Sequence, residues 1–144
     1  MRVQVGPFDP AAHVRTRDHY QALRREAALA GLGPETPARR WEALVGRLHQ
    51  ELRLDPVAEA VDRAFSAGRP AFTAATVVPD ETLPAALATC RALDALLAEL
   101  DRAAAEEADE LLAAPAEVRA YARRFLAQVT AQLEAALDGP RPGP

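Results

Sequence analysis

The chain has 144 residues, enough for a single domain with a hydrophobic core, and its formal net charge is −4. This acidic balance argues against a sequence-independent nucleic-acid binder, which needs a basic surface to neutralise phosphates. No apolar run approaches the roughly 18 residues of a membrane span, and a single cysteine excludes an internal disulfide and fits a reducing cytoplasm. The absence of lysine, asparagine and isoleucine is typical of a bacterium with a G+C-rich genome.

Three helices are predicted within residues 1–69, because a capping residue is followed by proline three times. Aspartate and threonine accept hydrogen bonds at a helix N-cap, and proline fits the first turn. The first helix should end at Gly31 and the third at Gly68, where glycine allows the chain to leave the helix. The second has the clearest apolar stripe of the three. The starts are Asp9-Pro10, Thr36-Pro37 and Asp55-Pro56, and the stripe consists of Trp41, Leu44, Val45, Leu48 and Leu52.

Residues 70–81 are predicted to be a linker or a short strand. Strand-forming residues run from Phe72 to Val78 between prolines. A lone strand cannot satisfy its backbone, and its only local partner is the Val3–Val5 segment, so a two-stranded ribbon is one interpretation. The interpretation that we favour is an extended linker between the N-terminal helices and the C-terminal half.

Residues 82–138 predict two long helices, since apolar side chains recur every three or four positions on both sides of Pro115. Proline interrupts the helical hydrogen bonds, so we expect the chain to reverse there into an antiparallel hairpin. Residue numbers facing each other would then be symmetric about the proline. This register places Ala104 opposite Phe125, Ala108 opposite Tyr121, Glu106 near Arg123 and Glu110 near Arg119. The Gly- and Pro-rich residues 139–144 are expected to be a disordered tail.

The predicted fold is therefore all-α and forms one domain over residues 1–138. It is a helical bundle of about five helices, in which three N-terminal helices pack on a long C-terminal antiparallel hairpin, with room for a minor two-stranded β-ribbon.

No constellation of residues predicts catalysis, a metal site or a cofactor. The chain has no phosphate-binding glycine loop and no Glu-x-x-His motif, and His13 and His19 are six positions apart, so they do not share a helix face. Cys90 lies on an apolar stripe and should be buried and unreactive. Trp41–Leu52 and Val57–Phe65 could form a helix-turn-helix, but Glu59 and Asp62 on the second helix would be repelled by phosphate, so nucleic acid is not an expected partner.

Two functional hypotheses follow. The first is a non-enzymatic, cytoplasmic interaction or regulatory module that acts through protein–protein contacts. It would form a homodimer through apolar residues off the hairpin seam, namely Leu96, Leu112 and Leu126. The alternative is a small-ligand-binding protein or enzyme with an anion-binding pocket near the arginine-rich first helix, lined by Arg15, Arg17, His19 and Trp41. A polar pocket at these residues would favour the alternative, and a flat apolar face would favour the first hypothesis.

Overall fold

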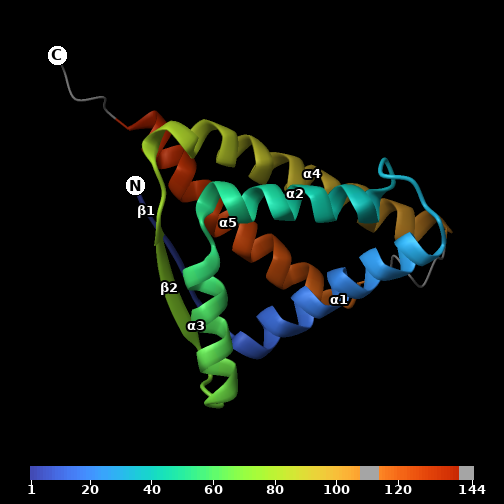
Figure 1. The fold of residues 1–144 in the computed structure, drawn as a ribbon, viewed down its shortest axis with the longest axis horizontal. Coiled ribbons are helices and arrows are strands. Elements are labelled where there is room, and N and C mark those ends of the chain that lie inside the picture. The colour runs from blue at the N-terminus through green and yellow to red at the C-terminus, as the bar shows by residue number, and fades with distance from the viewer. Residues whose placement is uncertain (108–113, 140–144) are drawn as a thin grey trace.

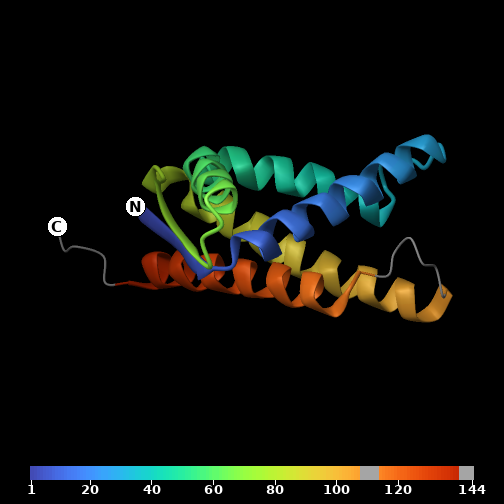
Figure 2. The ribbon, with the colours of Figure 1, turned by 90° about the horizontal axis from the view of Figure 1, so that it is seen from below.

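The computed structural model describes residues 1–107 and 114–139. Its elements in chain order are β1 (Arg2–Phe8), α1 (Pro10–Leu29), α2 (Pro37–Leu52), α3 (Asp55–Ser66), β2 (Phe72–Val77), the short helix η1 (Asp80–Thr82), α4 (Leu83–Glu107) and α5 (Ala116–Asp138). Helices α1, α2, α4 and α5 contact one another in a ring, while α3 and the β-ribbon lie at one end, beside the N-terminus (Figure 1). In the view turned by 90°, α1 and α2 form an upper layer and α5 lies in a lower layer (Figure 2). The predicted all-α bundle with a minor ribbon is confirmed.

The three N-terminal helices begin at the predicted proline pairs, but the predicted cap is right only for α1, since Asp55 is the first residue of α3 and Leu54 is its N-cap. The Asp9 side chain accepts a hydrogen bond from the Ala11 N–H at 2.9 Å, as an N-cap should. Thr36 makes no such bond, because its hydroxyl donates to the Gly33 carbonyl instead. At the end of α3, Gly68 has a φ of +65°. The Arg69 N–H donates to the Ala64 carbonyl at 2.9 Å, which closes the helix as predicted.

Residues 72–77 form a strand, so the linker interpretation is wrong and the ribbon interpretation is right. Strand β2 pairs antiparallel with β1, with Val3 opposite Thr76 and Val5 opposite Ala74. Val3 and Val5 are almost fully buried. Their burial attaches the ribbon to the bundle and makes pairing more favourable than an extended, solvated linker.

The outer edge of β1 is bonded to two glutamine side chains of α5. Gln132 accepts from the Gln4 N–H at 2.8 Å and donates to the Gln4 carbonyl at 2.7 Å. Gln128 makes the same pair of bonds to Gly6, both at 2.9 Å. The outward-facing backbone groups of Gln4 and Gly6 are therefore satisfied by a helix.

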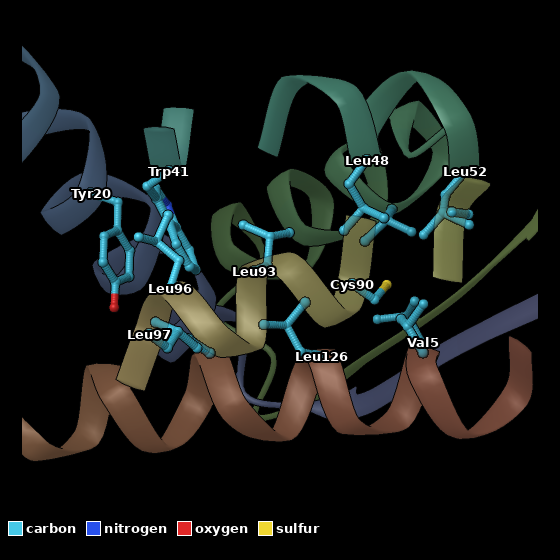
Figure 3. Packing of buried hydrophobic residues seen from close by; sticks show 14 of the residues in the cluster. Val5, Tyr20, Trp41, Leu48, Leu52, Cys90, Leu93, Leu96, Leu97 and Leu126 are labelled. Carbon is cyan, nitrogen blue, oxygen red and sulfur yellow. The ribbon is translucent and has the colours of Figure 1, made fainter. Parts of the chain in front are cut away.

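The core lies between α4, α5 and α2 (Figure 3). Leu96 is 1% exposed and Leu126 is 5% exposed, so the prediction that these leucines lie on an uncovered interface is wrong. Leu96 is on α4, which packs against α2 and α5, and Leu126 is on α5, which packs against α1 and α4. Both leucines are therefore covered within a single chain. The third predicted interface residue, Leu112, lies outside the described residues. Cys90 is buried as predicted, and burial raises the pKa of its thiol to about 11.

The hairpin is confirmed, but its predicted register is wrong. Asp101 pairs with Arg123 and, at 3.7 Å, with Arg119, while Arg91 pairs with Glu134 at 3.3 Å. These pairs are displaced by four to nine residues, about one to two and a half helical turns, from the predicted symmetry about Pro115. The physical reason is that Pro115 is the N-cap of α5 and not the apex of the turn. The side chains predicted opposite Tyr121 and Phe125 and beside Arg119 and Arg123 (residues 104, 106, 108 and 110) lie outside those that the structure describes.

Candidate ligand pocket

A pocket of about 530 Å³ lies between α1, α2, α3 and α5. Most of its lining is apolar or aromatic, and Leu93 of α4 and Leu126 of α5 contribute to it. Tyr20 and Trp41 stack at one wall, with ring centroids 4.5 Å apart (Figure 3). Val45, predicted to be part of the buried stripe of α2, is 40% exposed and lines this pocket. The volume and lining are those of an ordinary small-molecule site.

Helix α1 supplies most of the polar groups of the pocket from one face. His13, Arg17, Tyr20 and Arg24 are spaced by four, three and four residues, which places them on a single stripe. The Asp9 cap and Pro10 fix where the helix begins, and burial of Thr16, Leu23 and Ala27 fixes its rotation. The α1 stripe of His13, Arg17, Tyr20 and Arg24 therefore faces the pocket as a consequence of ordinary amphipathic packing.

Two of the four residues proposed from the sequence line the pocket, and two do not. Arg17 and Trp41 belong to the lining. Arg15 lies on another face of α1, with its Nε 3.6 Å from a carboxylate oxygen of Glu117. His19 is also outside the lining, and its Nε2 is buried without a hydrogen-bond partner among the described residues. Burial lowers the pKa of His19, which keeps this ring neutral.

The two arginines of the pocket differ in their hydrogen bonding. Arg24 donates to Glu42 at 2.7 Å, a contact that joins α1 to α2. Arg17 has carboxylate oxygens of Asp18 and Asp62 3.6 Å away, too far for a hydrogen bond. Within residues 1–107 and 114–139 the Arg17 guanidinium therefore makes an ion-pair contact but no hydrogen bond.

His13 is one of the pocket residues that the sequence interpretation did not assign to the site. Its Nδ1 lies 2.6 Å from the hydroxyl of Tyr121, and its ring meets Phe72, Tyr121 and Phe125 edge to face. Burial, with the nearby Arg17 charge, lowers the pKa of His13 to about 4. The pKa of Tyr121 is raised by burial, so the phenol keeps its proton. The sequence signal was available, because His13 and Arg17 are four residues apart on one helix face.

The 2.6 Å contact between Tyr121 and His13 fits either neutral tautomer of the imidazole, so we choose the tautomer that leaves the Tyr121 hydroxyl hydrogen bonded. Tyr121 has one hydroxyl hydrogen, and Nδ1 of His13 is its hydrogen-bond partner among the described residues. We therefore assign Tyr121 as the donor and Nδ1 as the acceptor. The neutral imidazole then carries its hydrogen on Nε2, and His13 is part of the pocket lining.

We expect the free energy of unfolding to decrease as the pH is lowered, because His13 is harder to protonate in the folded chain than in the unfolded chain. Its pKa is about 4 in the folded chain and near its ordinary 6.5 when unfolded, so the unfolded chain binds the extra proton. The stability from neutral His13 is fully present above pH 6.5 and is lost as the pH falls towards 4, by up to about 3 kcal/mol. Urea unfolding at several pH values should show a shallower pH slope for His13→Phe than for the unchanged protein. Equal slopes would contradict this linkage.

The hydroxyl of Thr16 in the pocket donates to the Ala12 carbonyl within its own helix and is not placed to act as a nucleophile. Among the described side chains, no group of three or more histidine, cysteine, aspartate or glutamate residues could hold a metal ion. None of the helices in the described ranges is long and apolar enough to cross a membrane. The chain matches no known protein-family model, and searches of curated proteins and solved structures found no match.

Proposed function

We propose that this protein binds a small, mainly apolar molecule in the pocket between α1, α2, α3 and α5. The observation that carries the proposal is the pocket itself, about 530 Å³ in volume, with an apolar and aromatic lining and a few polar groups at defined positions. Such sites surround most of a small ligand and use their few polar groups to orient it.

The pocket supports ligand binding better than the protein-interaction hypothesis. The exposed large apolar residues of the described chain lie on separate elements, so they do not form the continuous stripe that a helical partner would need. They are Leu29, Leu32, Val45, Phe65 and Val77. It remains a prediction that the protein has a protein partner, forms a homodimer or is cytoplasmic. Two of the three leucines proposed for the dimer interface, Leu96 and Leu126, are buried in the core.

Filling the pocket should weaken binding without unfolding the protein. Ala58 lies on α3, lines the pocket and is only partly buried, so Ala58→Phe can extend into the cavity. We expect the affinity for Nile red, a neutral apolar dye, to fall at least about tenfold, as a phenyl ring would occupy the dye's volume. Dye fluorescence measures binding, and Trp41, the single tryptophan, reports it from the pocket wall.

Ala58→Ser is the matched control, because it changes the same position by one small group. It should bind Nile red within about twofold of the unchanged protein. Equal dye affinities for Ala58→Phe and Ala58→Ser, or no dye binding by the unchanged protein, would contradict the proposed function.

A further inference from the structure

Arg17 and His13 are two potential hydrogen-bond donors on the α1 wall of the pocket. Both belong to the α1 stripe, one helical turn apart, and both line the cavity. With Tyr121 assigned as the donor to Nδ1, the hydrogen of the neutral His13 ring is on Nε2. The Arg17 guanidinium is charged and makes no hydrogen bond within the described chain. The other pocket arginine, Arg24, is already bonded to Glu42.

We propose that the ligand is an amphipathic monocarboxylic acid, whose carboxylate is bound by Arg17 and by Nε2–H of His13. This inference rests on the proposed function and adds the chemical class and orientation of the ligand. A guanidinium donates two parallel N–H bonds that match the two oxygens of a carboxylate. The aliphatic or aromatic body of the acid then lies against Leu93, Leu126 and Trp41, which are apolar parts of the lining.

The carboxylates of Asp18 and Asp62 near Arg17 favour a ligand with one negative charge over a ligand with two. The Asp18 and Asp62 side chains near Arg17 are 62% and 68% exposed, so solvent screens them and they can turn away when a carboxylate binds. They would still repel a doubly charged phosphate more strongly than a carboxylate. One guanidinium and one neutral imidazole supply the donors for two oxygens, and the remaining pocket arginine is held by Glu42.

The test compares octanoate with octanol, which differ in the charged group and share an apolar chain. Each is titrated calorimetrically into the unchanged protein, Arg17→Gln and Arg15→Gln at neutral pH. We expect octanoate to bind the unchanged protein about tenfold more tightly than octanol, because a charge-assisted hydrogen bond is stronger than a neutral one. Arg17→Gln should remove this preference and leave the octanol affinity within about twofold.

Arg15→Gln is the matched control, since Arg15 lies on the same helix with an ion pair of the same 3.6 Å length but outside the pocket. It should keep the full preference for octanoate. Octanol binding without a preference for octanoate would overturn this inference and leave the proposed function standing. The inference would also fail if Arg17→Gln and Arg15→Gln reduced octanoate binding equally, since the effect would then come from the net charge of the surface.

Discussion

Replacing Leu96 by alanine is expected to lower the free energy of unfolding by about 2–5 kcal/mol, since truncating a buried leucine loses apolar contact and leaves a cavity. Leu96 is 1% exposed and lies in the core formed by α4, α2 and α5. Urea unfolding followed by circular dichroism measures the change. Sedimentation of the same variant should give the same mass as the unchanged protein.

Leu29→Ala is the matched control for Leu96→Ala. Leu29 ends α1 and is 88% exposed, so the same substitution there should change stability by no more than about 0.5 kcal/mol. A Leu96→Ala variant of unchanged stability that lost a dimeric mass would contradict the structure. That result would support the dimer interface at Leu96 that the sequence predicts.

Gly6→Ala is expected to destabilise the protein by about 2–5 kcal/mol. Gly6 has a φ of +99°, a backbone conformation that side-chain-bearing residues rarely adopt. A Cβ at this position would overlap the carbonyl oxygen of Phe72 on the paired strand and lie 3.2 Å from the Phe8 nitrogen. The register of the ribbon shifts between Val5 and Phe8, so Gly6 lies in the irregular part of the β1–β2 pairing. Thermal unfolding should show the loss as a lowered midpoint.

Gly46→Ala makes the same chemical change with the opposite expected sign. Gly46 lies within α2, and a Cβ there would meet no atom within 4 Å. Alanine favours a helix interior over glycine, so we expect a gain of about 0.5–1 kcal/mol. A destabilised Gly46→Ala, or a Gly6→Ala variant of unchanged midpoint, would contradict the described backbone.

The sequence predicted well what depends on neighbouring residues. The starts of α1, α2 and α3 follow proline geometry, which acts within one turn, and the predicted side-chain cap forms only at Asp9 of α1. Burial of Cys90 followed from its place on an apolar stripe. The hairpin register failed because proline fits both an N-cap and a turn apex, and only packing between the two helices decides which role Pro115 takes.

The candidate site could be predicted only in part, for a related reason. Helical spacing alone places His13 and Arg17 on one face, and the sequence named Arg17 and Trp41. Which face of α1 meets α2, α3 and α5 depends on contacts far apart in the chain, such as that between His13 and Tyr121. Arg15 and His19 were therefore grouped with the site by proximity in sequence, although they lie on other faces.

The glutamine contacts between α5 and β1 have a consequence for how this protein meets other chains. The edge of a sheet is a template onto which a foreign strand can add, and such addition begins aggregation. Four residues of helix advance about 6 Å, and two residues of strand advance about 6.7 Å, so Gln128 and Gln132 match the repeat of Gly6 and Gln4. Helix α5 thus occupies the place of a third strand. The ribbon cannot recruit one from another molecule along this edge while α5 stays docked.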